Sequence, residues 1–164
     1  YYREASDNDV RFIRWEPDNK PRVEAAEYEW DSVVGAVAEV SVDGKGKLRV
    51  EELWIAIDAG LVVNPDRVIS QMEGAGIFGM SLALHGEITA KDGVIVQGNY
   101  DTYPVVRMSE VPKAINAHIM DVDAPPGGVG EPGVPPVAPA IVNAYFAATG
   151  KRVRELPLKK FGAV

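Results

Sequence analysis

Residues 48–84 read LRVEELWIAIDAGLVVNPDRVISQMEGAGIFGMSLAL, a stretch that predicts one β-strand followed by one long helix. In residues 48–58, apolar side chains alternate between two faces, which is the period of a strand. One face carries Leu53, Ile55 and Ile57, and the other carries Leu48, Val50, Trp54 and Ala56. Because both faces are apolar, we expect both to be partly covered.

The helix is expected over residues 65–84. Asn64 is a favoured cap, Pro65 suits the first helical position, and apolar residues recur behind them at helical spacing. Three glycines interrupt this helix, and each costs up to about 1 kcal/mol against Ala. We therefore expect close packing to be the reason for Gly74, Gly76 and Gly79.

The flanking segments predict further strands and a second helix. Residues 34–42 alternate like a strand, and the turn at Asp43-Gly44 joins them to residues 48–58 as a hairpin. The other expected elements are a hairpin of strands 87–90 and 94–97 around Asp92-Gly93, a strand at 115–119, and a helix that starts near Pro135, Pro136 and Pro139, runs to Thr149 and stops at Gly150. The predicted fold class is therefore α+β, with a mixed sheet built from hairpins, a long central helix and a C-terminal helix.

Residues 1–32 differ in character from the rest of the chain. They are densely charged and show little periodicity, so we predict a charged connector or an edge segment there. Residues 33–164 are assigned to one domain-sized unit. The sequence begins at Tyr1 rather than at a methionine, so we expect it to be part of a longer protein, and we leave the compartment open between cytoplasm and periplasm.

Composition excludes several classes of function. The net charge of −7 argues against a nucleic-acid partner, because phosphate binding depends on Lys and Arg. No cysteine is present, so this chain holds no thiolate zinc site and no iron–sulfur cluster. His85 and His118 stand alone, and we expect no metal held by protein side chains. No run approaches the roughly 20 apolar residues of a transmembrane helix, so no membrane span is expected.

A loop rich in glycine and proline lies between the last predicted strand and the last helix. Residues 127–133 read GGVGEPG and offer backbone N–H groups that no side chain hinders, next to a predicted helix N-terminus that favours negative charge. Glu131 stands inside this loop. From the residues alone, two interpretations stay open: a general base whose basicity is set by its surroundings, or a carboxylate that caps the following helix.

Several motifs, taken in order, resemble the end of molybdenum hydroxylase large subunits, the xanthine dehydrogenase and aldehyde oxidase family. The resemblance covers roughly residues 33–158, and residues 103–108 and 147–153 are similar to isoquinoline 1-oxidoreductase β-subunits and related aldehyde dehydrogenases in particular. Ala59 departs from the family, which usually has Cys there. The motifs are Asp58-Ala59-Gly60, Val63-Asn64-Pro65, Gln71-Met72-Glu73-Gly74, Asn99-Tyr100-Asp101-Thr102-Tyr103-Pro104, Gly128-Val129-Gly130-Glu131-Pro132 and Ala138-Pro139-Ala140-Ile141-Val142-Asn143-Ala144.

The resemblance implies a cofactor and a role for five residues. The cofactor is a molybdopterin-type molybdenum cofactor in the full-length protein, whose metal is held by the pterin rather than by protein ligands. Glu131 would act as the base on a molybdenum-bound hydroxyl, which then attacks an electron-poor carbon while hydride passes to the metal's sulfido ligand. The cofactor-binding residues implied are Gln71, Gly128, Val129 and Gly130.

The resemblance also implies partners and a substrate class. The chain would be the C-terminal part of a larger molybdopterin-binding domain, working with the remainder of the large subunit and an iron–sulfur small subunit. A cytochrome is a further partner that the resemblance allows. The small-molecule substrate would be an N-heteroaromatic compound that is hydroxylated or an aldehyde that is oxidised. We expect the isolated fragment to be inactive. The alternatives are a non-catalytic anion-binding or subunit-interaction module of the same fold, and a regulatory phosphate-binding domain.

Overall fold

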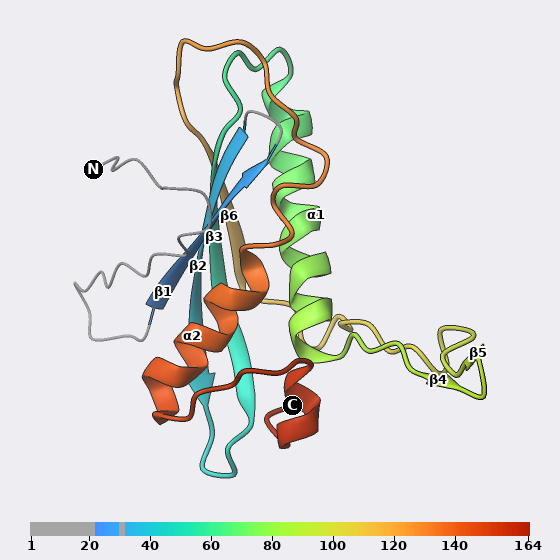
Figure 1. The fold of residues 1–164 in the computed structure, drawn as a ribbon. Helices are drawn as coiled ribbons and strands as arrows, with labels where there is room; N and C mark the ends of the chain where they lie inside the picture. The colour runs from blue at the N-terminus through green and yellow to red at the C-terminus, as the bar shows by residue number, and fades with distance from the viewer. Residues whose placement is uncertain (1–21, 30–31) are drawn as a thin grey trace.

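The computed structural model describes residues 22–29 and 32–164 of the chain. They form a four-stranded sheet, a small two-stranded sheet, two α-helices and a short 3₁₀ helix (Figure 1). In chain order the elements are β1 (Arg22–Glu29), β2 (Ser32–Val42), β3 (Leu48–Asp58), α1 (Pro65–Leu84), β4 (Ala90–Lys91), β5 (Val94–Ile95), β6 (Ala114–Ile119), α2 (Val137–Thr149) and η1 (Leu158–Phe161).

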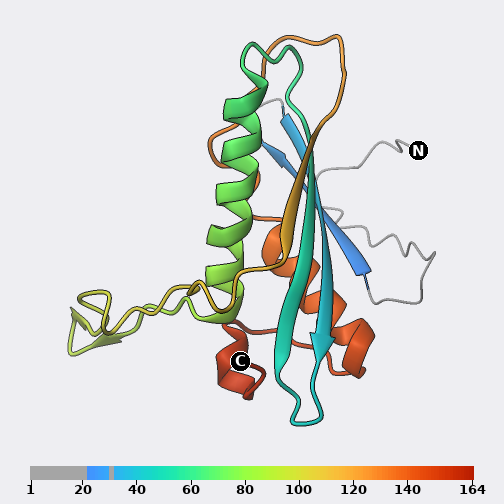
Figure 2. The same ribbon diagram turned by 180° about the vertical axis from the view of Figure 1, so that it is seen from behind.

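The main sheet is mixed, with strand order β1-β2-β3-β6. Strands β1, β2 and β3 pair antiparallel, whereas β6 pairs with β3 in the parallel direction. Both helices pack on one face of this sheet, α2 against β1 and β2 and α1 against β6 and β3, as Figures 1 and 2 show from opposite sides. This arrangement confirms the predicted α+β class with a mixed sheet, a long central helix and a C-terminal helix.

Strands β2 and β3 form the predicted hairpin, but an irregularity corrects the predicted faces of β3. Glu39 pairs with Glu52 and Val40 with Val50, so Glu51 is an extra residue that bulges from the ladder. A bulge reverses the alternation of side chains on one side of it. Val50 is therefore buried in the same core as Leu53, and Leu48 packs against that core, whereas the plain period of two put both on the opposite face.

The bulged Glu51 is held by charge and hydrogen bonding. Its carboxylate accepts a hydrogen bond from the Ser41 hydroxyl at 2.6 Å and lies 2.9 Å from the Lys113 ammonium. These two contacts keep the pKa of Glu51 below its ordinary value. Because Lys113 immediately precedes β6, this ion pair fastens the start of β6 to β3.

Helix α1 has the predicted bounds and the predicted cap. The Asn64 side chain accepts a hydrogen bond from the Arg67 N–H, and Pro65 is the first helical residue. Close packing explains two of its three glycines. A Cβ on Gly79 would lie 2.6 Å from the Val137 Cβ, and one on Gly76 would lie 3.3 Å from side-chain atoms of the sheet. Gly74 is exposed with nothing within 4 Å of that position, so the packing explanation was wrong for Gly74.

Between α1 and β6 the chain forms an arm that projects away from the rest of the fold (Figures 1 and 2). Its hairpin turns at Asp92 and Gly93 as predicted, and both have positive φ. Strands β4 and β5 are shorter than the predicted 87–90 and 94–97, because the Thr89 N–H donates to the Gln97 side chain at 2.7 Å in place of a backbone carbonyl. The large apolar side chains exposed along the arm are Ile88, Val94, Ile95, Val96, Tyr100 and Met108.

The C-terminal region closes the fold. Helix α2 ends at Thr149, and Gly150 takes the left-handed conformation with its N–H donating to the Phe146 carbonyl, as the sequence predicted. The Lys159 ammonium donates to the His85 carbonyl at 2.7 Å, which ties η1 to the end of α1. None of the helices in the described ranges combines the length and the apolar character needed to cross a bilayer.

Much of the predicted N-terminal connector, residues 1–21 and 30–31, lies outside the described residues. The described part of the predicted connector is β1, which is an edge strand of the main sheet and pairs along its whole length with β2. The division of the chain at residues 32 and 33 stays a prediction.

The glycines of α1 give a matched test of the packing. Gly79→Ala should destabilise the protein by about 1–3 kcal/mol, because the added methyl overpacks the contact with α2. Gly74→Ala should stabilise it by roughly 0.5–1 kcal/mol, because it replaces an exposed helical glycine without a clash. Thermal unfolding of the two variants beside the wild type measures both shifts, and equal shifts would contradict the packing described here.

Candidate functional site

Gly128, Val129, Gly130 and Glu131 lie on the loop after β6, and Gln71 lies on α1, which follows the loop after β3. Because β3 and β6 are parallel, the loop after β3 and the loop after β6 both begin at their carboxyl ends. In open sheets that contain parallel strands, ligands bind outside these carboxyl ends. Figure 1 shows the loop after β6 arching over this edge and descending beside α1.

The two loops interlock through their backbones. The Leu61 N–H donates to the Ala124 carbonyl at 2.9 Å, and the Gly127 N–H donates to the Ala59 carbonyl at 2.8 Å. Gly60 has φ +59, and a Cβ there would lie 2.8 Å from the Ala124 carbonyl oxygen and closer still to that of Pro125. Only glycine fits both the conformation and the space.

Asp58 shapes the first of these loops. Its carboxylate accepts a hydrogen bond from the Gly60 N–H at 3.1 Å, which closes a tight Asx turn at the end of β3. Asp58 therefore has a structural role in this loop.

The second loop is also fitted closely to α1. A Cβ on Gly133 would lie 2.7 Å from the Ala75 Cβ and 3.0 Å from the Met72 sulfur, and Gly133 itself is buried. This contact brings the glycine-rich segment against the N-terminal half of α1. As a result, the Gln71 amide nitrogen lies 3.9 Å from the Cβ position of Gly130. The structure thus brings together Gln71 and Gly130, which are far apart in sequence.

The face formed here is rich in free hydrogen-bond donors. Gln71, Gly128, Gly130 and Glu131 are exposed. Within the described part of the chain, the backbone N–H groups of residues 128–131 donate no hydrogen bond, and neither does the Gln71 amide. An array of unhindered N–H groups suits a group that carries several oxygen acceptors, such as an oxo or phosphate group. The residues present therefore fit a molybdopterin-type cofactor.

Glu131 is not a helix cap. Its side chain is exposed, and its backbone carbonyl accepts a hydrogen bond from the Val134 N–H at 3.0 Å. Helix α2 begins only at Val137, with Pro136 at the cap position and no side-chain cap bond. Residues 132–136 separate Glu131 from the helix, so the capping interpretation is wrong. The expectation that the glycine-rich loop lies next to the helix N-terminus is wrong for the same reason.

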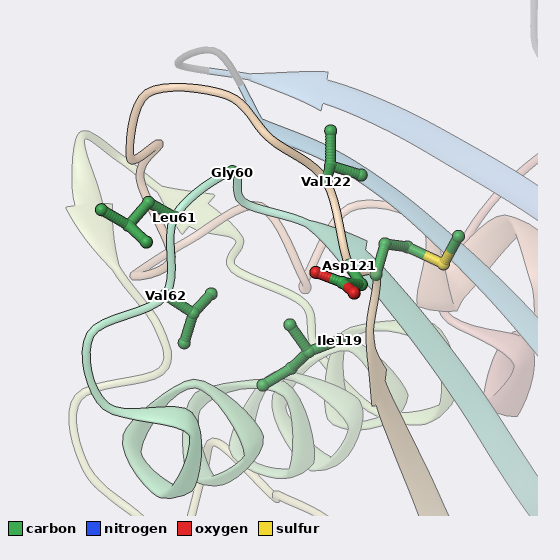
Figure 3. A pocket seen from close by; sticks show the side chains of 7 residues that line it. Gly60, Leu61, Val62, Ile119, Asp121 and Val122 are labelled. Atoms are coloured by element: carbon green, nitrogen blue, oxygen red, sulfur yellow. The ribbon is translucent and has the colours of Figure 1, made fainter.

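A small cleft opens beneath the interlocked loops (Figure 3). Its volume is about 240 Å³, and the Asp121 carboxylate points into it beside the apolar side chains of Val62 and Ile119. Pockets for small-molecule ligands typically measure about 300–1,000 Å³. The cleft lies below this range, and none of the predicted site residues lines it, so we assign it no catalytic part.

Metal-ligating side chains do not gather at this edge. No three His, Asp or Glu residues among those that the structure describes are placed to hold a metal ion. His85 instead lies 2.7 Å from the Glu110 carboxylate at the base of the arm.

Comparison with known proteins identifies the family. The family model of the molybdopterin cofactor-binding domain matches residues 7–112, which is more than half of the chain. This chain belongs to the molybdopterin cofactor-binding domain family. The resemblance and the cofactor class predicted from sequence are thereby confirmed. The matched range ends before the loop of Glu131, so it does not assign that residue.

Curated relatives of this molybdopterin cofactor-binding domain extend the match. The chain is 39% identical over 127 residues to the isoquinoline 1-oxidoreductase subunit beta of Brevundimonas diminuta, covering 77% of the chain and 16% of that protein. It is 34% identical to the aldehyde oxidoreductase molybdenum-binding subunit PaoC of Escherichia coli strain K12, covering 80% of the chain and 19% of that protein. The chain thus spans less than a fifth of the length of these relatives, which are named as subunits.

Solved structures share the fold of the domain. Quinoline 2-oxidoreductase from Pseudomonas putida 86 superposes with a TM-score of 0.70 at 21% identity, covering 80% of the chain and 18% of that chain. Aldehyde oxidoreductase from Desulfovibrio gigas superposes with a TM-score of 0.67 at 26% identity. The match covers 77% of the present chain and 14% of the Desulfovibrio chain. The α+β architecture is therefore that of the corresponding region of these proteins.

Sequence reasoning missed the residues that position the loops. The Ser32 hydroxyl donates to the Gly128 carbonyl at 2.7 Å across 96 positions of sequence, and no local pattern signals such a contact. The packing of Gly60 and Gly133 was equally hidden, although Gly60 lies in a motif that carried the family resemblance and Gly133 directly follows another.

The interlock of the two loops is testable at Gly60. Gly60→Ala should destabilise the protein by at least about 3 kcal/mol, because it adds a backbone clash to the cost of about 1–2 kcal/mol for a left-handed residue with a Cβ. Gly150→Ala is the matched control, since Gly150 has φ +71 and open space around it. Urea unfolding of both variants measures the difference, and equal losses of stability would refute the clash.

Proposed function

We propose that the chain is the part of a molybdenum-dependent hydroxylase subunit that carries the catalytic base, Glu131. The cofactor contacts in this proposal are the Gln71 amide and the backbone N–H groups of Gly128, Val129 and Gly130. One observation carries it: Gln71 lies beside Gly130 on an exposed face of unpartnered donors, although the two were assigned to the cofactor separately. The cofactor, when bound, supplies the two-electron redox centre.

The chemistry proposed for Glu131 follows from its position. Its carboxylate projects from the same segment as the free N–H groups and has no ion-pair or hydrogen-bond partner among the described residues. An ionised carboxylate within reach of a proton on the reacting oxygen removes that proton and holds it on an Oε atom. The backbone N–H groups and the Gln71 amide would orient the acceptor atoms of the bound cofactor while this proton is transferred.

The substrate and partners belong to the same proposal. The relatives are named for isoquinoline and for aldehydes, which supports an N-heteroaromatic compound or an aldehyde as the small-molecule substrate. The exposed apolar arm supports contact with the remainder of the large subunit, because such surface is seldom left in water. An iron–sulfur small subunit is proposed as the electron acceptor. A further cytochrome partner stays a prediction.

Removal of the basic group tests the proposed role of Glu131. In the full-length protein, Glu131→Gln should keep the molybdenum content and lower kcat by at least about 100-fold, since general-base catalysis contributes 10²–10⁴. Steady-state turnover with an aldehyde and with an N-heterocycle measures the loss. Glu155→Gln is the control, because Glu155 is an exposed carboxylate whose ion-pair partner among the described residues is Lys160. Unchanged turnover in Glu131→Gln would reject the base and favour a non-catalytic anion-binding module.

The separately produced chain gives a second test. Its donors contact the cofactor from one side only, and the chain covers 16% of the isoquinoline relative, so most contacts would come from elsewhere. We expect residues 1–164 alone to retain less than a tenth of a molybdenum atom per chain and to show no turnover. Elemental analysis after gel filtration measures this, and stoichiometric molybdenum would contradict a composite site.

A further inference from the structure

Ser32 is a buried polar residue whose hydroxyl makes one long-range hydrogen bond. It is the first residue of β2, it is fully buried, and its neighbour Val33 pairs with Asp58 at the carboxyl end of β3. A buried hydroxyl needs a hydrogen-bond partner. The Ser32 hydroxyl finds it in the Gly128 carbonyl at 2.7 Å, so one bond joins the interior of the sheet to an exposed residue of the glycine-rich loop.

This bond fixes the direction of one peptide unit. The carbonyl of Gly128 and the N–H of Val129 belong to the same peptide, and the only cis peptide in the described residues is Leu156–Pro157. In a trans peptide, these two groups point in opposite directions. Because Ser32 draws the Gly128 carbonyl inward, the Val129 N–H points outward. The Val129 side chain packs on the core and holds the other end of the unit.

Among the described residues, no second side-chain hydrogen bond reaches residues 128–131. Gly127 is held through its N–H by the Ala59 carbonyl, and Glu131 through its carbonyl by the Val134 N–H. Between these two points, the Ser32 bond is the one side-chain hydrogen bond to residues 128–131 within the described ranges. Because glycine has wide conformational freedom, Gly128 lets the peptide turn about the packed Val129 end once that bond is lost.

We propose that Ser32 is a positioning residue that aims the Val129 N–H at an oxygen acceptor of the bound cofactor. The inference rests on the proposed function, because it takes residues 128–131 to face the cofactor. Ser32 does not touch the cofactor; it acts through the Gly128–Val129 peptide. The site therefore depends on a residue outside every motif that carries the family resemblance.

The test uses the full-length protein with its cofactor and compares Ser32→Ala with Ser32→Thr, which keeps a hydroxyl. Ser41→Ala is the matched control, because Ser41 lies on the same strand but is exposed and bonds to Glu51. Hydrogen exchange of a peptide that spans residues 126–134 reports the loop, and molybdenum retained during dialysis reports the cofactor. Loss of one hydrogen bond should speed both loop exchange and molybdenum loss on the order of fivefold in Ser32→Ala. Ser32→Thr and Ser41→Ala should behave as wild type.

If Ser32→Ala fails to fold, Ser32→Cys is the second variant that tests the hydrogen bond. A thiol fills nearly the same space as the hydroxyl but is a weak hydrogen-bond donor. This variant should show the same two changes, while exchange in a β3 peptide stays unchanged. Faster loop exchange with normal molybdenum retention would overturn the assignment of the Val129 N–H to the cofactor, and wild-type exchange would overturn the anchor itself. The two hypotheses fail differently: the proposed base fails by full turnover in Glu131→Gln, and the Ser32 inference fails by full molybdenum retention in Ser32→Ala.

Discussion

Because β6 pairs with β3 in the parallel direction, the chain leaves both strands at the same edge of the sheet. The meeting of the two loops at the candidate site follows from this constraint. It places the turn at Gly60 against residues 124–127, so the glycine-rich segment starts from a fixed point. An antiparallel β6 would have delivered that segment to the opposite edge, away from the N-terminal half of α1 and from Gln71.

Glycine is used in two different ways at this edge. At Gly60 and Gly133, the absence of a side chain allows backbone and helix to approach closely, and an added methyl would meet immovable atoms. Gly128 and Gly130 are exposed, and the absence of a side chain leaves N–H groups accessible there. The first pair makes the loop rigid and the second makes it able to receive a ligand. Together they form a preorganised set of donors without any charged ligand to a metal.

The parts of the structure that depend on local pattern were predictable from sequence. The cap at Asn64, the bounds of α1, the hairpin at Asp43-Gly44 and the stop at Gly150 are decided by neighbouring residues. The family resemblance supplied the cofactor and pointed to Gln71 and Glu131. Features that depend on distant contacts were not predictable. The bulge at Glu51 moved Val50 to the core face, and nothing near residue 32 in the sequence indicated a bond to Gly128.

The central claim is that the cofactor faces the edge formed by Gln71 and residues 128–131. A crystal structure of the full-length protein with its cofactor tests this most directly. We predict cofactor acceptor atoms within hydrogen-bond distance of the Gln71 amide and the Val129 N–H, with the Glu131 carboxylate beside the metal. A cofactor bound elsewhere, with another protein segment packed over this edge, would contradict it.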